Sequence, residues 1–171
     1  MPNATVDTAN AQMSGGPIQD RNRLLQFVSF RIGGEEFGLN ILTVQEIIRI
    51  QRLTRVPNAP PCVEGVINLR GKVIPVIALR KRFGLEARAH DEHTRIVVIE
   101  TRGKVLGLIV DSVSEVLRIP AETLEPPPHF EKTDRANVLA MGKVEDRLLI
   151  VLDADRLLDD TGPGTSTQVE C

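Results

Sequence analysis

The sequence contains no tryptophan and no tyrosine, and its aromatic side chains amount to five phenylalanines. The platforms on which single-stranded nucleic acids stack are therefore missing. An excess of positive charge is missing too, because 21 basic side chains are balanced by 23 acidic ones and leave a formal net charge of −2. Nucleic-acid binding depends on such an excess, so the composition argues against a nucleic-acid partner.

Long apolar runs and cysteines are also scarce. The longest apolar runs, such as 105–110, are far too short to cross a bilayer, and no basic-then-apolar leader opens the chain. The two cysteines, Cys62 and Cys171, are too few for the disulfide framework of a small secreted domain, which fits a reducing compartment. We therefore expect the 171 residues to form a soluble, cytoplasmic protein with one domain or at most two small ones.

Two segments of the chain are poor in large apolar residues. Residues 1–22 and 160–171 consist mainly of small and polar residues, and they cannot bury enough apolar surface to offset the entropy of ordering. We expect both to be flexible tails. The segment 23–159 between them is expected to hold the folded domain.

Within the folded segment, short apolar stretches alternate with turn residues, a pattern typical of β-strands. The pair Gly33 and Gly34 permits a tight hairpin between the first two of them. The expected strands are 25–32, 35–39, 63–69, 73–77, 95–100, 105–110, 138–144 and 148–152. So many short strands with little helix predict an all-β fold of barrel or sandwich type.

Three helices are expected between the strands. Asn40 is a plausible cap for a helix over 40–49, in which apolar residues recur at helical spacing. A short helix over 79–83 is expected to end at Gly84, and another over 154–158 closes the folded segment.

The sequence also repeats itself in order. A shift of 69 residues superimposes one stretch on a later one, and a shift of 75 superimposes the stretch that follows, with the difference absorbed in a loop. The matching pairs are Gly38 with Gly107, Leu39 with Leu108, Val44 with Val113, Glu46 with Glu115, 73–77 with 148–152 and 79–83 with 154–158. Chance similarity between β segments is the alternative. The ordered recurrence of four elements favours a duplication, and hence two related small barrels that share an interface.

Candidates for catalysis or metal binding are weak. The string His90–His93 lies in a polar linker without imposed geometry, so a solvated loop is expected, and His129 is isolated after three prolines. Asp153 precedes a short helix, where capping is its ordinary role, rather than forming an acid–base pair with Asp155. The sequence has no phosphate-binding glycine loop, no G-x-S-x-G elbow and no nucleophile with a nearby base. We expect no catalytic activity, no metal and no cofactor.

Two further patterns have ordinary explanations. The basic run 80–82 (R-K-R) could be an anion-binding patch, but on a short surface helix it is more often the solvated face. The prolines 126–128 resemble a polyproline ligand, but they lack suitable basic flanks and are expected to stiffen a connection.

The turn N-L-R-G at 68–71, between two apolar strands, is a stronger candidate. Gly71 can take positive φ and Asn68 can bond to nearby backbone, so both have a role in the turn. Arg70 has no such duty, and a planar guanidinium fixed on a rigid turn suits recognition of a carboxylate. Glu46, on the predicted helix, could pair with Arg70 across the groove between helix and turn, with orientation rather than stability as the gain.

The apolar stripe of the segment 40–49 recurs in the second copy of the repeat. The stripe consists of Val44, Ile47 and Ile48, and its counterparts are Val113, Val116 and Leu117. Burial is the ordinary expectation for each of these side chains. A groove between the two barrels could leave some apolar edges available to a partner helix.

Four stretches of the chain together resemble the CheW family of chemotaxis coupling proteins. They read F-R-I-G-G-E-E-F-G-L, N-I-L-T-V-Q-E-I, G-V-I-N-L-R-G-K-V-I-P-V-I-A-L-R and V-L-G-L-I-V-D-S-V-S-E-V-L. The resemblance runs in order from about residue 24 to 158, and its most specific part is the N-L-R-G turn with the following V-I-P-V-I strand. One departure is Ala78, where family members commonly carry aspartate; a lost helix cap of about 1 kcal/mol is the minimal consequence.

The resemblance implies an all-β fold of two intertwined five-stranded barrels, each like a Src-homology-3 domain, with a few short helices. It also implies no catalysis, because family members bridge the cytoplasmic tips of chemoreceptors (methyl-accepting chemotaxis proteins) to the regulatory domain of the histidine kinase CheA. The kinase-binding surface is expected at a barrel end. The partner-binding residues implied near the receptor-facing groove are Val44, Glu46, Gly65, Asn68, Arg70, Gly71, Val113 and Val116.

The expected function is therefore that of a non-enzymatic scaffold in chemotaxis signal transduction, part of a two-component system. We expect a protein that is monomeric when isolated and is recruited from the cytoplasm to membrane receptor arrays without inserting into the membrane. Two alternatives stay open. The same fold could serve a chemotaxis-like pathway that controls pili, gliding or development. It could also be a stand-alone barrel that binds an anion or metal through Arg70, 80–82 or His90 and His93.

Overall fold

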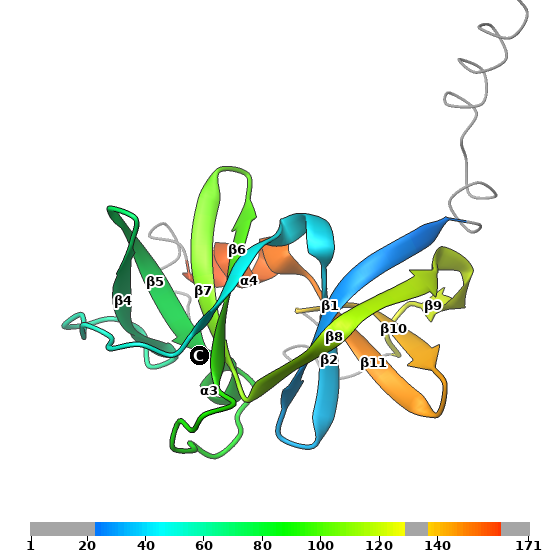
Figure 1. Ribbon diagram of the computed structural model, residues 1–171, viewed down its shortest axis with the longest axis horizontal. Helices are drawn as coiled ribbons and strands as arrows, with labels where there is room; N and C mark the ends of the chain where they lie inside the picture. Colours follow the sequence, from blue (N-terminus) through cyan, green and yellow to red (C-terminus); the bar gives the residue numbers. More distant parts are fainter. Residues whose placement is uncertain (1–22, 129–136, 162–171) are drawn as a thin grey trace, which may run out of the picture.

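The computed structural model describes residues 23–128 and 137–161, and side chains through Leu158. Within these ranges the chain forms two β-sheets and four short helical segments (Figure 1). The predicted tail 1–22 lies outside the described residues, as do 162–171 of the predicted tail 160–171 and the segment 129–136 with His129. Residues 160 and 161 continue the last helix.

One sheet has six strands and the other has five. The six-stranded sheet has the order β8 (Ser112–Pro120), β1 (Leu24–Ile32), β2 (Glu35–Asn40), β11 (Arg147–Leu152), β10 (Val138–Val144) and β9 (Leu124–Glu125). The five-stranded sheet has the order β3 (Val44–Arg49), β6 (Arg95–Thr101), β7 (Lys104–Val110), β5 (Lys72–Ala78) and β4 (Val63–Leu69). Neighbouring strands are antiparallel except for the parallel pairs β2–β11 and β5–β7.

The chain crosses between the two sheets twice, so neither sheet is built from one continuous segment. After β2 it passes through the 3-10 helix η1 (Ile41–Thr43) into β3 of the five-stranded sheet. It returns at Asp111, the single residue between β7 and β8. In Figure 1, β3 and β8 are the strands that run between the two halves of the molecule. The predicted intertwined all-β fold is confirmed; the two-residue β9 gives one sheet a sixth strand.

The strand register reproduces the sequence repeat. Val76 on β5 lies opposite Gly107 on β7, and Val151 on β11 lies opposite Gly38 on β2. These are the same pairs under the shifts of 75 and 69 residues, so one parallel contact is made twice. A Cβ added at Gly107 would lie 3.0 Å from Ile96 Cγ2, which explains why both positions lack a side chain in so tight a contact.

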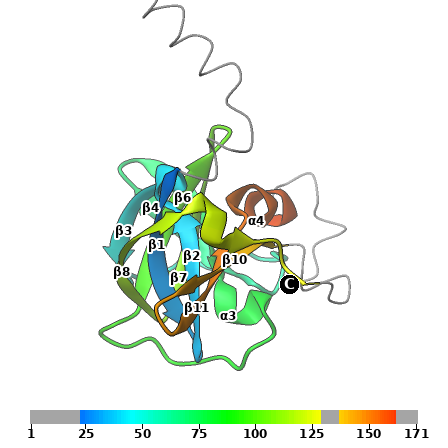
Figure 2. The same ribbon diagram turned by 90° about the vertical axis from the view of Figure 1, so that its right-hand side faces the viewer.

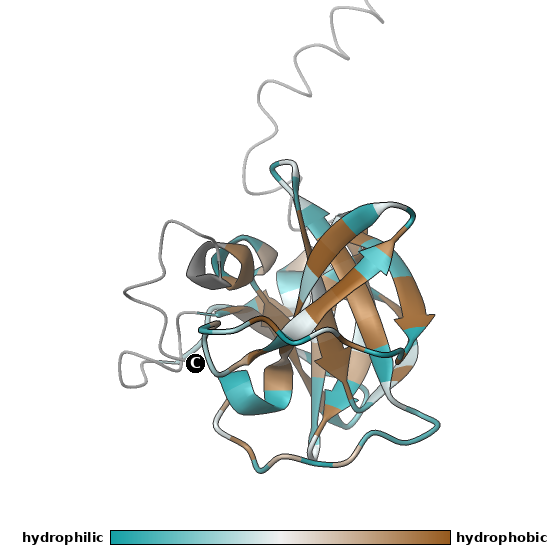
Figure 3. Ribbon diagram, turned by 90° about the vertical axis from the view of Figure 1, so that its left-hand side faces the viewer, coloured by the Kyte–Doolittle hydropathy of each residue, from teal (hydrophilic) through white to brown (hydrophobic). Residues whose placement is uncertain are grey.

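Three apolar clusters hold the sheets together. The largest contains residues of both sheets and of the helices α3 (Leu79–Arg82) and α4 (Ala154–Thr161), so it joins the two halves of the molecule. The other two clusters fill the interior of one sheet each, around Ile74 and Ile96 in the five-stranded sheet and around Phe27 and Leu149 in the six-stranded one. Figure 3 shows apolar residues along the strands and hydrophilic ones at hairpin tips. The helices and the crossing strands lie on opposite sides of the molecule (Figure 2).

The edge of the five-stranded sheet is closed by the chain that follows β3. Thr54 and Val66 of β4 exchange backbone hydrogen bonds of 2.9 and 2.8 Å, so the segment after one edge strand is bonded to the other edge strand. Between them lies Gly65, whose φ is +155° and whose hydrogen faces the Thr54 carbonyl oxygen at only 2.4 Å from an ideal Cβ position. This close approach requires glycine.

The predicted helix over 40–49 is wrong. The chain makes the three-residue η1 and then enters β3 at Val44, so Glu46 lies on a strand. Exposure alternates along β3, and its β-branched side chains fit a pleated strand better than a helix. The predicted cap is nevertheless confirmed, because Asn40 Oδ1 accepts a hydrogen bond of 2.9 Å from the Leu42 N–H. A second strand, β8, was not predicted at all.

The remaining predicted turns and caps are confirmed. Gly33 takes φ of +64° in the first hairpin, and Gly84 takes +75° after α3. Asp153 Oδ1 accepts hydrogen bonds from the backbone N–H groups of Asp155 (3.0 Å) and Arg156 (3.3 Å), which caps α4. At the corresponding start of α3, no side-chain cap is made by Ala78 among the described residues.

Removing the α4 cap should cost a moderate amount of stability. We expect Asp153→Ala to lower the free energy of unfolding by about 1 kcal/mol, because an orphan N–H at the helix start loses its acceptor. The measurement is urea unfolding followed by circular dichroism. Asp153→Asn keeps the accepting oxygen and should retain most of the stability; an equal loss in both variants would contradict the capping role.

Candidate functional site

The turn between β4 and β5 presents Arg70 in a fixed backbone conformation. Leu69 pairs with Lys72, and the two residues between them, Arg70 and Gly71, have φ of +52° and +86°. Asn68 Oδ1 accepts a hydrogen bond of 2.9 Å from the Gly71 N–H. The turn roles predicted for Asn68 and Gly71 are confirmed, and the tight turn gives Arg70 a rigid base.

Arg70 and Glu46 form the ion pair that the sequence predicted. The guanidinium donates two hydrogen bonds to the carboxylate, Nη2 to Oε1 at 3.0 Å and Nη1 to Oε2. The pair joins β3, one edge strand of the five-stranded sheet, to the end of β4, the other edge strand. The Arg70 side chain is 73% exposed, so the pair contributes only about 0–1 kcal/mol to stability. Its effect is to point an accessible guanidinium in one direction.

Apolar side chains lie near this pair. Ile47, next to Glu46 on β3, is 39% exposed, and Val73 on β5 is 68% exposed. Val44, at the start of β3, is half-buried and packs against the cluster between the sheets. A shallow hollow is lined by Gln45, Leu69, Arg70, Lys72, Ile74 and Val105. A charged group with exposed apolar neighbours is a feature of surfaces that bind other proteins.

Strand β8 carries the repeat counterparts. Val113 packs against the cluster between the sheets, as Val44 does, and Leu117 packs inside the six-stranded sheet. Val116 is 51% exposed, like its counterpart Ile47, so the expectation of burial is wrong for Val116. Strands β3 and β8 lie on the same side of the molecule in Figures 1 and 2. We call this surface, with its exposed Ile47 and Val116, the crossing face.

Gly65 does not belong to any exposed surface. It is buried where Thr54 closes the five-stranded sheet, and a glycine there offers no side chain to a partner. Any part that it has in binding is indirect, since it allows the segment after β3 to pack on β4 close to the Arg70 turn.

The second copy of the repeat has a modified version of the ion pair. Glu115, the counterpart of Glu46, is bound by Arg147 Nη2 at 3.3 Å, and the same guanidinium reaches Glu36 at 3.2 Å. The position that matches Arg70 is Glu145, also with positive φ. The sequence analysis missed this group, although the repeat places an acid at Glu115.

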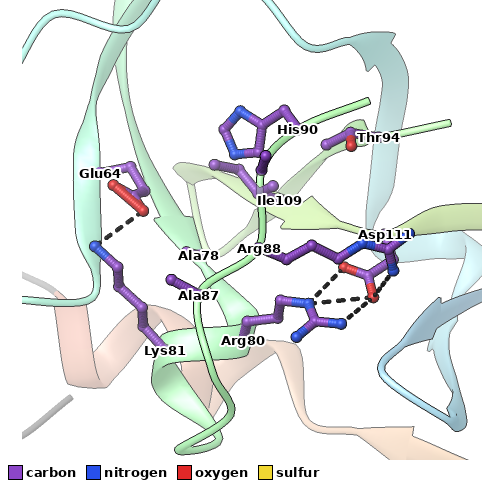
Figure 4. A pocket seen from close by; sticks show the side chains of 11 residues that line it. Glu64, Ala78, Arg80, Lys81, Ala87, Arg88, His90, Thr94, Ile109 and Asp111 are labelled. Atoms are coloured by element: carbon purple, nitrogen blue, oxygen red, sulfur yellow. Dashed lines mark hydrogen bonds and ion pairs between the residues drawn. The ribbon is translucent and has the colours of Figure 1, made fainter. Parts of the chain in front are cut away.

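A further charged group lies where the chain returns to the six-stranded sheet (Figure 4). The Asp111 carboxylate accepts hydrogen bonds from Arg80 Nε and Nη2, both at 2.9 Å, and from the Gly33 N–H at 2.8 Å. Arg88 Nη1 approaches the same carboxylate at 3.4 Å. Partial burial alone would raise the pKa of Asp111, but the Arg80 and Gly33 hydrogen bonds and the charges of Arg80 and Arg88 together hold it below its usual range.

The depressed pKa of Asp111 makes its stabilising effect depend on pH. A carboxyl whose pKa is lower in the folded state stabilises the fold above its unfolded pKa, near about 4, and the stabilisation disappears as the pH falls through the folded pKa. We therefore expect Asp111→Asn to be less stable than the wild type at neutral pH, with the difference shrinking below about pH 4. Urea unfolding across this range tests the prediction, and a gap that stays constant down to acid pH would contradict it.

The basic run 80–82 is not a solvated face. Arg80 binds Asp111, Lys81 Nζ lies 3.0 Å from Glu64 Oε1, and Arg82 Nη2 donates to Asn137 Oδ1 at 3.0 Å. All three cations are therefore tied to the surrounding structure. They offer little to an anion in the described parts of the chain.

The other candidates of the sequence serve local structure. Asp91 accepts hydrogen bonds from the backbone N–H of His93 at 2.8 Å and of Thr94 at 3.2 Å, so the acid in the string His90–His93 shapes its own loop. Asp155 contacts Thr101 and lies 3.6 Å from Arg102 Nε, apart from the capping role of Asp153. Within 23–128 and 137–158 no three potential ligands gather to hold a metal ion.

None of the helices within the described ranges is long and apolar enough to cross a membrane.

Comparison with known proteins adds three results. The CheW-like domain family model matches residues 26–162. The chemotaxis protein CheW of Klebsiella aerogenes is 40% identical over 134 residues, which cover 78% of this chain and 81% of that protein. The CheW of Helicobacter pylori is 36% identical over 145 residues, covering 85% and 88% of the two chains. The crystal structure of the scaffolding protein TtCheW from Thermoanaerobacter tengcongensis superposes with a TM-score of 0.73 at 40% identity, over 77% of this chain and 90% of that one.

Proposed function

The chain belongs to the CheW-like family, and from this membership we propose that it is a chemotaxis coupling adaptor, a scaffold that works by binding rather than by catalysis. Its partners would be the cytoplasmic tips of chemoreceptors and the regulatory domain of the histidine kinase CheA. It would act in the cytoplasm, recruited to receptor arrays at the membrane.

The observation that carries the proposal is the Arg70–Glu46 pair beside the crossing face. A guanidinium held in one direction by two hydrogen bonds can recognise a partner carboxylate, while Ile47 and Val116 offer apolar contact to a partner helix. Each contact is modest by itself. Binding several partners in one array raises their effective concentration, so modest contacts suffice for a scaffold.

The residues proposed to bind a partner fall into three groups. Arg70 and Val116 are exposed and can touch a partner, with Glu46 orienting Arg70. Asn68 and Gly71 fix the turn, and Gly65 fixes the closure beside it. Val44 and Val113 anchor the two crossing strands on the cluster between the sheets. The groups therefore differ in what their replacement would change: contact, turn geometry or strand position.

The proposal is tested by reconstitution. Purified receptor signalling fragments and CheA are mixed with and without this protein, sedimented together, and assayed for kinase phosphorylation. Kinase should join the receptor fraction when the protein is present and remain in the supernatant without it. If the protein binds neither component, the function is wrong even though the fold stands.

The same experiment separates the alternatives. Receptors from a pathway for pili, gliding or development, substituted for chemotaxis receptors, reveal which system the adaptor serves. A stand-alone ligand-binding barrel would instead give a stoichiometric response to phosphate, nucleotides or zinc in calorimetry.

A further inference from the structure

One carboxylate connects the two sheets where the chain returns to the six-stranded one. Asp111 follows β7 directly and precedes β8 directly. On the six-stranded side, its backbone N–H donates to the Arg31 carbonyl at 3.0 Å, and its Oδ2 accepts from the Gly33 N–H at 2.8 Å. Asp111 is thus bonded to both ends of the turn between β1 and β2.

The other side of the same carboxylate is bound from α3, which follows β5 of the five-stranded sheet. Arg80 reaches Oδ1 through Nε and Oδ2 through Nη2, both at 2.9 Å, and its Nη1 is fixed by the Glu86 carbonyl at 2.8 Å (Figure 4). The side chains of Arg80 and Asp111 are only 19% and 15% exposed. A two-pronged pair shielded from solvent fixes direction as well as distance, unlike the exposed Arg70–Glu46 pair.

The first crossing is held in another way. Under the shift of 69 residues the counterpart of Asp111 is Leu42, which is 83% exposed. There the chain is ordered by short-range bonds within η1, from the Leu42 N–H to Asn40 Oδ1 and from Thr43 Oγ1 to the Asn40 carbonyl. The charged connection therefore belongs to the return crossing and is not a general requirement of the repeated fold.

Strand β8 begins directly at this connection. Val113, two residues after Asp111, packs against the cluster between the sheets, and Val116 is exposed on the crossing face. The register of β8 on β1 shifts between Ser29 and Phe30, so the start of β8 is bonded to β1 less regularly than the rest. A segment with an irregular register needs a separate constraint to keep one position.

We infer that Asp111, held by Arg80, is a positioning residue that fixes the start of β8 relative to the five-stranded sheet and thereby sets the geometry of the crossing face. The inference rests on the proposed function for its consequence in binding, but its structural part stands by itself. A partner that contacts both β3 and β8 would bind well only if the two strands keep their relative position.

The test uses the full-length protein with Asp111→Asn and Arg80→Gln. Hydrogen exchange followed by mass spectrometry should show faster exchange at 31–34 and 111–116 and unchanged exchange in β4, β5, β10 and β11. Binding of a receptor signalling fragment, titrated by calorimetry, should weaken by about three- to thirtyfold, the range expected for a residue that touches no ligand.

Lys81→Gln is the matched control. Lys81 is the next residue on α3 and also makes an ion pair, at 3.0 Å to Glu64 of β4, but both partners lie on the five-stranded side. This variant should leave the exchange pattern and the affinity as in the wild type. Arg80→Lys, which keeps the charge and loses the fork, should fall between the wild type and Arg80→Gln in both measurements.

Three outcomes would overturn the inference. One is wild-type exchange at 111–116 in Asp111→Asn. Another is faster exchange throughout both sheets in Asp111→Asn and Arg80→Lys alike, which would mean that the pair supports overall stability and not the position of β8. The third is local opening with unchanged affinity, which removes the link to binding. If the wild type binds no receptor fragment, the proposed function fails, and the exchange experiment still decides the positioning role.

Discussion

Replacing Arg70 by alanine should weaken the binding of a receptor signalling fragment by about ten- to hundredfold, the loss typical of an arginine at the centre of an interface. The free energy of unfolding should stay within about 1 kcal/mol of the wild type, because the guanidinium is largely exposed and its pair with Glu46 is worth little in water. Calorimetric titration and urea unfolding of the same preparation measure both effects.

The matched control for Arg70→Ala is Arg102→Ala. Arg102 and Gly103 form the turn between β6 and β7 with φ of +52° and +77°, the same geometry as the turn of Arg70. Arg102 is also exposed and pairs with an acid, Asp155. Its loss should leave receptor binding unchanged. Equal weakening in both variants, or an Arg70→Ala protein that unfolds much more easily, would contradict a specific binding role.

A substitution of the partner acid separates contact from orientation. Glu46→Gln keeps a hydrogen-bond acceptor but removes the charge that holds Arg70, so we expect a smaller loss of affinity than for Arg70→Ala. Removing both side chains together should cost less than the sum of the single losses, because the two residues act as one unit. Additive losses would mean that Glu46 contacts the partner independently.

The turn at 68–71 could be predicted because its chemistry is local. Only the side chain of Asn68 and the freedom of Gly71 are needed to form it, and both can be read from neighbouring residues. The pairing of Arg70 with Glu46 was predicted although Glu46 was placed on a helix. Opposite charges on either side of a groove attract each other whether the backbone is helical or extended, so the error in secondary structure did not affect it.

Strand β3 could not be separated from a helix by its sequence alone. Its apolar residues recur at helical spacing, but Val44 faces the cluster between the sheets while Ile48 faces the interior of one sheet. The bulge between Val44 and Glu46 in the pairing with β6 shifts the alternation by one residue. A strand that crosses between two cores therefore imitates the helical pattern.

The Asp111 connection lay beyond sequence reasoning for a different reason. Its partners Arg80 and Gly33 are 31 and 78 residues away, and nothing local links them. Arg80 was placed on a solvated face because a basic run on a short helix usually is one. The one available signal was the failed repeat, which puts an acid at 111 where the first copy has Leu42.

A second large effect is expected at Gly65, on stability. In Gly65→Ala an ideal Cβ would lie 2.4 Å from the Thr54 carbonyl oxygen, and φ of +155° is a conformation that side chains rarely adopt. The contact is with backbone, so it can be relieved only by moving the segment that closes the five-stranded sheet. We expect a loss of about 3 kcal/mol in the free energy of unfolding, measured by urea and thermal unfolding.

Two other glycines separate the clash from the backbone conformation. Gly71 has φ of +86° and no atom within 4 Å of an added Cβ, so Gly71→Ala should cost only the conformational strain, about 1 kcal/mol. Gly34 has neither feature, and Gly34→Ala should be close to neutral. If Gly65→Ala costs no more than Gly71→Ala, the bonds between Thr54 and Val66 do not hold the sheet closed. If it costs more, and the folded variant also binds receptor weakly, the closure supports the Arg70 turn, which follows on the same strand.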